Sequence, residues 1–441
     1  MKSKLERSLA LQQKSKRLIP GMTQLLSKRP DMFSLGVWPG YFSRAKGVNV
    51  WDLDDNCYID MSIGGIGANS MGYADPDVDA AVLEAIANGT SCSLNCPEEV
   101  YLAELLCELH PWADMVRYAR TGGEAMAVAV RIARAHTNRD KVAFCGYHGW
   151  HDWYLAANLK NGEALDSHLL PGLDPRGVPK TLAGTALPFH YNDVAELEAI
   201  FSGNKGEIAA VILEPIRNNP PEPSFMAAVR SLARENGAVI VYDEISSGFR
   251  LNTGGAHLIV TDVEPDMAVF SKGMSNGYPM AAILGRARVM EAAQSTFISS
   301  TYWTDRVGPV AALATLRKHR RVDAGKHLCA MGQAVQRGWR EIADRHGLDV
   351  SIGGIFPLSH FGFEHPRALD LKAYFVQLML ERGFLASTQF YSMYAHQHEH
   401  VDEYLRAADE AFGLLRTGLD EDTLGAALEG APARQGFARL N

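Results

Sequence analysis

Short, largely apolar runs recur through the middle of the chain and alternate with amphipathic segments. These runs are found at residues 115–118, 142–144, 208–213, 238–242, 267–270 and 281–284. Runs this short and this apolar are typical of strands buried on both faces of a parallel sheet. Between them, residues 124–136 repeat apolar positions with a helical period, and residues 225–236 predict a second helix that ends at Gly237. The pattern predicts an α/β fold with a mostly parallel sheet covered by helices.

The flanking regions follow other patterns. Residues 48–60 predict a β-hairpin, because an alternating strand meets an Asp-Asp-Asn turn and returns. Pro97 opens a helix that runs to Leu109, and a long helix begins near Arg306. After that helix come further helices with amphipathic strands such as residues 351–357, which predict a smaller α+β domain.

These patterns predict two domains. We expect an N-terminal segment, residues 1–63, that joins the small domain, then a large domain over residues 64–311 and a small C-terminal domain over 312–441. Residues 425–441 are rich in alanine and glycine and are expected to be weakly ordered.

Composition narrows the possible functions. The chain has 441 residues, a formal net charge of -8 and no long basic stretch, which argues against nucleic acid as a partner. No apolar run is long enough to cross a bilayer, and the basic N-terminus lacks the apolar core of a secretion signal. Six cysteines without a CxxC pair favour reduced, mostly buried thiols. We therefore expect a cytoplasmic protein without a membrane partner.

The strongest chemical signal is a lysine and an aspartate, each placed at the end of an apolar run. Lys272 follows residues 267–270, and Asp243 follows residues 238–242. Parallel strands place functional groups at their carboxyl ends, so both side chains are expected to face one crevice. An amine and an acid held in this way suit pyridoxal phosphate, which takes a lysine as a Schiff base and an acid at its pyridine nitrogen. Taken singly, Asp243 could cap a loop and Lys272 could belong to an ion pair.

Two loops add to this picture. Residues 121–125, Thr-Gly-Gly-Glu-Ala, lie between a strand and a helix, where free amides and the helix dipole suit a phosphate group. A plain tight turn is the alternative. Residues 147–153 are rich in aromatic side chains that could stack on a flat cofactor or form a patch beneath a loop.

Two groups of histidines are candidate metal ligands. His148 and His151 lack an evident third ligand. His396, His398 and His400 would share a face in a strand, but the segment from Glu399 predicts a helix that scatters them. We therefore expect solvated histidines and no metal.

Taken together and in order, these motifs resemble the class III, fold-type I pyridoxal-phosphate aminotransferases, within which the chain looks most like the glutamate-1-semialdehyde aminomutase branch. The similarity runs from about Leu18 to Arg416. The segments that carry it are residues 51–56, 58–60, 121–125, 147–149, 213–215, 242–245, 248–250, 271–273 and 300–302.

The resemblance implies a large domain with a mostly parallel sheet covered by helices, a smaller α+β domain and pyridoxal 5'-phosphate as cofactor. It implies that Lys272 binds the cofactor covalently and moves a proton, while Asp243 keeps the pyridine nitrogen protonated. The cofactor contacts that it implies are the Gly122 and Gly123 amides at the phosphate, Tyr147 and Ile245 on the two ring faces, Glu214 and Asn219 near the phenolic oxygen, and Thr301 at the phosphate of a neighbouring subunit. The active unit would then be a homodimer with active sites at the interface.

Departures from the branch concern the substrate. Gly123 stands where the branch has a threonine, Lys28 where it has a carboxylate-binding arginine, and Tyr391 where it has a glutamate. Lysine is a point charge and not a fork, so bidentate carboxylate binding is weakened. Lys28, Trp38 and Tyr391 are the candidate substrate contacts, and a more apolar pocket is expected.

The resemblance predicts an aminotransferase that moves an amino group between an amino acid or amine and a ketone or aldehyde by a ping-pong mechanism. An aminomutase or a racemase on the same fold is the alternative. A third possibility is a pseudoenzyme that binds the cofactor structurally, against which the retention of Lys272, Asp243 and Thr301 argues.

Overall fold

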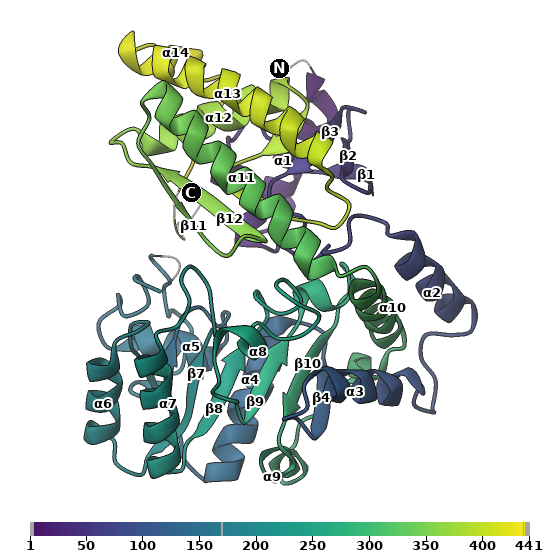
Figure 1. Cartoon of the computed structure of the whole chain (residues 1–441), viewed down its shortest axis with the longest axis vertical. Coiled ribbons are helices and arrows are strands. Elements are labelled where there is room, and N and C mark those ends of the chain that lie inside the picture. Colours follow the sequence, from purple (N-terminus) through teal and green to yellow (C-terminus); the bar gives the residue numbers. More distant parts are fainter. Residues whose placement is uncertain (1–3, 169–170, 435, 437–441) are drawn as a thin grey trace. The chain divides into compact units, whose positions relative to one another are not determined.

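The computed structural model describes residues 4–168, 171–434 and 436 (Figure 1). The chain divides into two compact units. One unit comprises the described residues up to Asp75 together with those from Lys326 onward, and the other comprises Pro76–Gly325. Each unit has its own sheet and core.

The unit Pro76–Gly325 is built on a seven-stranded sheet with the order β4-β10-β9-β8-β7-β5-β6. Its strands are β4 (Met115–Ala119), β5 (Lys141–Cys145), β6 (Ala186–Pro188), β7 (Ile208–Leu213), β8 (Val239–Asp243), β9 (Met267–Phe270) and β10 (Ala281–Gly285). The pairs from β9 through β6 are parallel, and only β10 runs antiparallel to its neighbours β9 and β4. The link from β9 to β10 is too short for the crossover helix that a parallel connection needs.

Helices cover both faces of this sheet, as the sequence predicts. One apolar core contains residues of α3 (Glu98–Leu109), α6 (Val194–Gly203), α7 (Pro223–Asn236) and α10 (Val307–Arg321). A second core lies on the other face, around α4 (Gly122–Thr137). Helix α2 (Pro76–Ala87) packs against α10, and the remaining helices are short: α5 (Asp152–Leu155), α8 (His257–Val260) and α9 (Ala287–Met290). Strands β7, β8 and β9 are buried at every position, which explains their apolar sequences.

The other unit is α+β. A four-stranded sheet joins β1 (Phe42–Lys46), β2 (Asn49–Asp52), β3 (Cys57–Met61) and β13 (Phe384–Ala386), and a three-stranded sheet joins β11 (Val350–Gly353), β12 (Leu358–Phe363) and β14 (Gln389–Tyr391). Strands β2 and β3 form the predicted hairpin. Helices α1 (Glu6–Leu18), α11 (Ala324–His346), α12 (Ala368–Glu381), α13 (His398–Asp420) and α14 (Leu424–Ala427) complete the unit.

The division differs from the boundaries expected after residues 63 and 311. Residues 64–75 stay with the α+β unit, because the Tyr394 N–H donates to the Ser70 carbonyl at 2.8 Å and Gly47 pairs with Tyr73. Helix α10 stays with the large sheet, because it packs against α2 and α3.

The segment after α13 is more ordered than expected over its described part. Ala433 is buried, and the N–H groups of Ala431 and Arg434 donate to the carbonyls of Leu35 and Asp31. The expectation of weak order is therefore wrong up to Arg434, while residues 435 and 437–441 lie outside the described residues.

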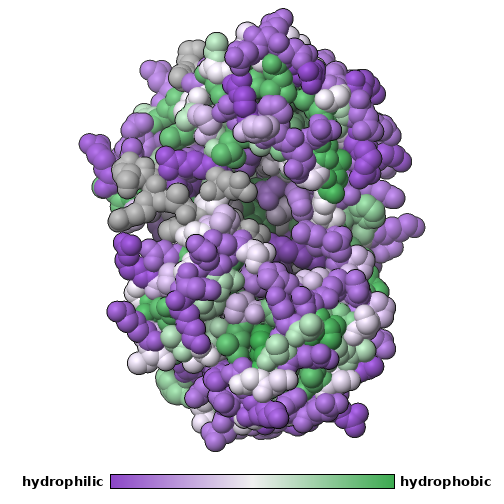
Figure 2. All heavy atoms as spheres, turned by 90° about the vertical axis from the view of Figure 1, so that its left-hand side faces the viewer, coloured by the Kyte–Doolittle hydropathy of each residue, from purple (hydrophilic) through white to green (hydrophobic). Residues whose placement is uncertain are grey.

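All six cysteines are free, but the expectation that most are buried is wrong. Cys145 is buried, whereas Cys57 and Cys92 are exposed. Across the described ranges, no helix combines the length and apolarity that a membrane span needs. On the face drawn in Figure 2, hydrophilic side chains cover most of the surface, with smaller hydrophobic areas between them.

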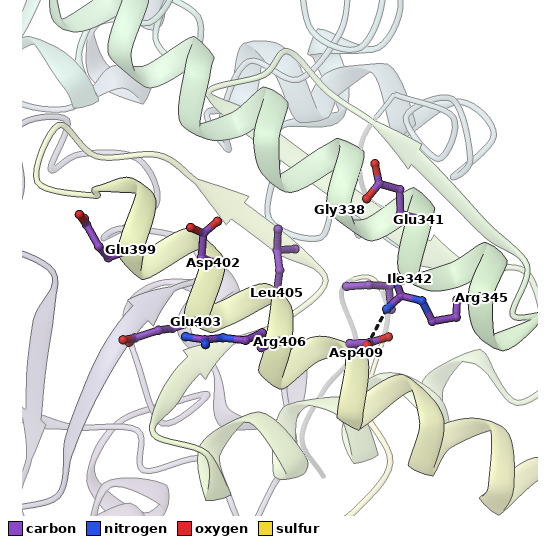
Figure 3. A pocket seen from close by; sticks show the side chains of 10 residues that line it. All are labelled: Gly338, Glu341, Ile342, Arg345, Glu399, Asp402, Glu403, Leu405, Arg406 and Asp409. Atoms are coloured by element: carbon purple, nitrogen blue, oxygen red, sulfur yellow. Dashed lines mark hydrogen bonds and ion pairs between the residues drawn. The ribbon is translucent and has the colours of Figure 1, made fainter.

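A surface groove of about 510 Å³ lies between α11 and α13 (Figure 3). Its lining is mostly charged, with Glu341 and Arg345 from α11 and Asp402 and Asp409 from α13. Arg345 and Asp409 form an ion pair across it at 2.6 Å. Exposed charges of both signs with a single ion pair among them are typical of an ordinary solvated surface.

Candidate active site

Strand register brings the predicted lysine and acid to one edge of the sheet. Asp243 is the last residue of β8 and is paired in register with Val269 of β9, three residues before Lys272. On the other side, Tyr242 pairs with Leu213 of β7, so Glu214 follows beside Asp243. The carboxyl ends of β7, β8 and β9 therefore present a carboxylate, a carboxylate and an amine side by side.

Lys272 is held in an unusual conformation at this edge. Its φ is +45°, in the left-handed region that non-glycine residues rarely adopt, and such strain clusters at functional sites. Its Nζ donates to Ser246 Oγ at 2.7 Å. Burial lowers the pKa of Lys272 to about 8, against the opposing attraction of Asp243 and Glu214. About a tenth of the amine is thus unprotonated at pH 7, far more than for a lysine of ordinary pKa, and a nucleophilic lysine reacts through this form.

Asp243 is fixed by a buried histidine. His148 Nδ1 lies 2.8 Å from Asp243 Oδ2, and His148 Nε2 lies 3.0 Å from the Cys145 carbonyl oxygen. Both partners are acceptors when Asp243 is ionised, so the arrangement is satisfied when the ring carries a proton on each nitrogen. The Ile245 N–H donates to Asp243 Oδ1 at 3.0 Å. The carboxylate is therefore oriented from two sides.

The N-terminus of α4 forms a cradle that fits a phosphate. Thr121 is the N-cap and forms a capping box with Glu124, which leaves the first amides of the helix directed outward. A Cβ at Gly122 would lie 2.8 Å from Ile245 Cδ1, so the backbone approaches that side chain more closely than any larger residue would allow. Within the described part of the chain, the buried Nδ1 of His151 lacks a hydrogen-bond partner, and a Cβ at Gly123 would lie 3.1 Å from it. Free amides and an unsatisfied ring nitrogen suit an anionic group here.

Glu214 and Tyr147 lie next to this pair. Glu214 is 6% exposed, and its Oε2 accepts a hydrogen bond from Arg217 Nη1 at 2.7 Å and a long one from the Tyr147 N–H at 3.4 Å. Gly146, with φ +109°, lets the backbone pass the same carboxylate, because a Cβ there would lie 2.7 Å from Oε2. Burial raises the pKa of Tyr147, and the charge of Asp243 adds to the rise.

A buried polar network anchors the segment after Asp243. Glu244 Oε1 accepts from the N–H of His257 at 2.9 Å and lies 2.7 Å from His257 Nδ1. Trp112 Nε1 donates to His257 Nε2 at 2.9 Å, so the histidine proton lies on Nδ1, facing the carboxylate. Burial alone would raise the pKa of Glu244, but the hydrogen bonds from His257 hold it below its usual value.

Five further predicted residues have no described contact with Lys272 or Asp243. Asn219 and Thr301 belong to the same unit as Lys272 and are exposed. Lys28, Trp38 and Tyr391 belong to the other unit: Lys28 is exposed, Trp38 stacks on Phe33 with ring centroids 4.0 Å apart, and Tyr391 pairs with Leu358. The roles of these five residues stay predictions.

The expectation of solvated histidines near residue 400 is wrong for His396. This side chain is fully buried, accepts from the Met393 N–H at 2.9 Å and lies with Nε2 2.8 Å from the Asp60 carbonyl. Helix α13 begins at His398 and separates the other two from it. Among the described residues, no cluster of three or more potential ligands could hold a metal ion.

Three residues of the site had no role in the sequence-based prediction of cofactor contacts: His148, Ser246 and Arg217. His148 follows β5 by three residues and Ser246 follows Asp243 by three, so their positions after strand ends were the available signal. Arg217 lies four residues after the end of β7.

Comparisons with known proteins define the family. The model of the family Aminotransferase class-III matches residues 36–411. The 3-aminobutyryl-CoA aminotransferase of Cloacimonas acidaminovorans (strain Evry) is 32% identical over 428 residues, covering 94% of this chain and 99% of that protein. The 2'-deamino-2'-hydroxyneamine transaminase of Streptomyces kanamyceticus is 33% identical over 391 residues, covering 88% of this chain and 93% of that protein.

A solved structure agrees with these relatives. The PLP internal aldimine form of the FumI protein from Sphingopyxis sp. MTA144 has a TM-score of 0.85 and 25% identity, and the match covers 97% of this chain and 99% of that one. The chain therefore belongs to the class III aminotransferases. It is a transaminase of fold-type I that uses pyridoxal phosphate, which confirms the fold, activity and cofactor predicted from the sequence.

Proposed function

We propose that Lys272, Asp243 and Tyr147 are the catalytic residues of this transaminase. The observation that carries the proposal is an amine of lowered pKa beside an oriented carboxylate, at the ends of the adjacent parallel strands β8 and β9. When bound, pyridoxal phosphate supplies an electron sink for the negative charge that develops at the substrate carbon. The side chains around it bind, orient and move protons.

Each residue has a distinct task in this proposal. Lys272 binds the cofactor covalently and, once released, carries a proton at Nζ to and from the substrate carbon. Ser246 Oγ, 2.7 Å from Nζ, holds the free amine in reach. Asp243 pairs with the protonated ring nitrogen, and His148 keeps that carboxylate aimed.

The cofactor contacts follow the same geometry. The amides of Gly122 and Gly123 bind the phosphate at the start of α4. Tyr147 stacks on one face of the ring and Ile245 packs on the other, and the contact of Ile245 with Gly122 supports that placement. Glu214 and Asn219 lie near the phenolic oxygen.

We propose that the active form is a homodimer in which Thr301 reaches the phosphate of the neighbouring subunit. Its exposed side chain lies in a segment with two large exposed aromatic residues, Phe297 at 85% and Tyr302 at 74%. Exposed apolar side chains grouped in this way are typical of protein interfaces.

The free exposed thiols of Cys57 and Cys92 favour a reducing compartment, and we propose the cytoplasm.

We propose two classes of substrate: an amine or amino acid as the amino donor, and a ketone or aldehyde as the acceptor. The motifs at residues 51–60 and 300–302 support a place near the glutamate-1-semialdehyde aminomutase branch. The departures at Gly123, Lys28 and Tyr391 argue against that enzyme's own reaction, and they leave Lys28, Trp38 and Tyr391 as candidate substrate contacts.

A half-reaction screen tests the proposed function. The pyridoxal form of the purified protein is mixed with a panel of amines, and the absorbance of the bound cofactor is followed. Transamination predicts loss of that absorbance with one amine and accumulation of the pyridoxamine form, which a carbonyl acceptor then reverses. Return of the original spectrum without an acceptor, with inverted substrate recovered, would instead identify a racemase.

A further inference from the structure

The proposed reaction assigns no role to Arg217, whose guanidinium pairs with Glu214 of the site. Arg217 follows β7 and lies in the loop that leads to α7. Its side chain is 35% exposed, whereas that of its partner Glu214 is 8% exposed. The pair therefore joins a buried carboxylate to a cation that reaches solvent.

The loop that carries Arg217 is anchored near both ends. Tyr191 Oη donates to the Pro215 carbonyl at 2.8 Å, and the Glu222 N–H donates to Asn192 Oδ1 at 3.0 Å. Ile216 is buried between them in the chain. With Glu214 accepting from Nη1 at 2.7 Å, the guanidinium is fixed in position before any ligand arrives.

The charge of Arg217 acts on two groups of the site. Burial is the main cause that lowers the pKa of Lys272, and Arg217 contributes in the same direction. Burial is also the main cause that raises the pKa of Tyr147, and Arg217 opposes that rise. Together with its ion pair to Glu214, this places the guanidinium close enough to Lys272 and Tyr147 to interact with a ligand held there.

We propose that Arg217 binds a carboxylate of the amino donor or of the carbonyl acceptor, with Glu214 holding the guanidinium in place. This inference rests on the proposed transamination and adds its substrate class: amines and ketones that carry a carboxylate. A planar guanidinium presents a fork of N–H donors that matches a carboxylate, which the exposed ammonium of Lys28 does not. The carboxylate-binding group of this chain thus comes from the loop after β7.

The test compares amines that differ only in a carboxylate. The pairs are 4-aminobutanoate with propylamine, 3-aminobutanoate with 2-aminopropane, and alanine with ethylamine. The second-order rate constant for loss of cofactor absorbance is measured with the parent holoenzyme, Arg217→Gln and Arg217→Lys. Arg176→Gln is the matched control, because that side chain is 78% exposed and forms an ion pair with the neighbouring Asp174.

The proposal predicts that the parent prefers the carboxylate member of at least one pair. Arg217→Gln should lower the ratio of the two rate constants, carboxylate amine over plain amine, by about ten- to a hundredfold. The ratio for Arg217→Lys should lie between those of the parent and Arg217→Gln, and the ratio for Arg176→Gln should match the parent. A measurable rate with the plain amine shows that each variant remains folded and loaded.

Three results would overturn the proposal. An equal loss for both members of a pair would mean that Arg217 acts through Glu214 or Lys272 and not on substrate. A parent that reacts but shows no preference for the carboxylate would refute this inference while leaving transamination intact. A parent that reacts with no amine in the full panel would refute both.

Discussion

Replacing Lys272 with methionine in the cofactor-free protein should make the fold more stable at neutral pH. Methionine has a similar shape and carries no charge. The pKa of Lys272 falls from 10.5 to about 8 on folding, mainly through burial, so the protonated amine destabilises the folded state. That lowering corresponds to about 3 kcal/mol at any pH below 8, where the amine is protonated in both states.

The stability difference between Lys272→Met and the parent should depend on pH. As pH rises through 8 the folded protein loses the proton first, so the penalty shrinks, and it is gone above the unfolded value of 10.5. Urea unfolding of apo-protein should therefore show Lys272→Met more stable than the parent by about 3 kcal/mol at pH 7 and nearly equal to it above pH 10.5. Lys205→Met, at an exposed position of the same unit, is the control and should show no such trend. Equal stability at pH 7, or a difference that persists unchanged to high pH, would show that the buried ammonium does not destabilise the fold.

Three further substitutions test other parts of the account. Asp243→Asn keeps the side-chain shape but loses the charge at the ring nitrogen, so turnover should fall on the order of a hundredfold or more while cofactor affinity changes little; near-normal rates in a steady-state assay would contradict the assigned role. Thr301→Ala should weaken cofactor retention by about 1 kcal/mol in equilibrium dialysis, because it removes one hydrogen bond across the dimer; unchanged affinity would count against that contact. His257→Leu leaves the buried Glu244 carboxylate without its imidazole and should cost about 3–5 kcal/mol in urea unfolding, and a loss below about 1 kcal/mol would show that the network is not needed.

The core of the site was predictable because it follows from strand ends. Strands β8 and β9 are fully buried and parallel, so apolar runs alone locate Asp243 and Lys272 at one edge of the sheet. The start of α4 is equally readable, because the capping box between Thr121 and Glu124 is local in sequence. Patterns over a few neighbouring residues are sufficient to locate functional side chains that lie at the end of a strand or the start of a helix.

The features that were missed depend on contacts between distant segments. His148 contacts Asp243 across a sequence separation of 95 residues, and His396 contacts the Asp60 carbonyl across a separation of 336. Periodic patterns in the sequence do not indicate contacts between segments so far apart. Strand β10 has the same apolar character as the mutually parallel strands β7, β8 and β9, and its short connection to β9 makes it antiparallel to that strand. Burial alone does not encode strand direction or side-chain partners.

The central claim is that one lysine, Lys272, binds the cofactor, and labelling by reduction tests it directly. The protein is loaded with pyridoxal phosphate, treated with borohydride to make the bond permanent, digested and analysed by mass spectrometry. Lys372 is the internal competitor, because burial also lowers its pKa to about 8. We expect the added mass on Lys272 alone; a label on Lys372 or on another lysine, with Lys272 unmodified, would show that Lys272 does not bind the cofactor.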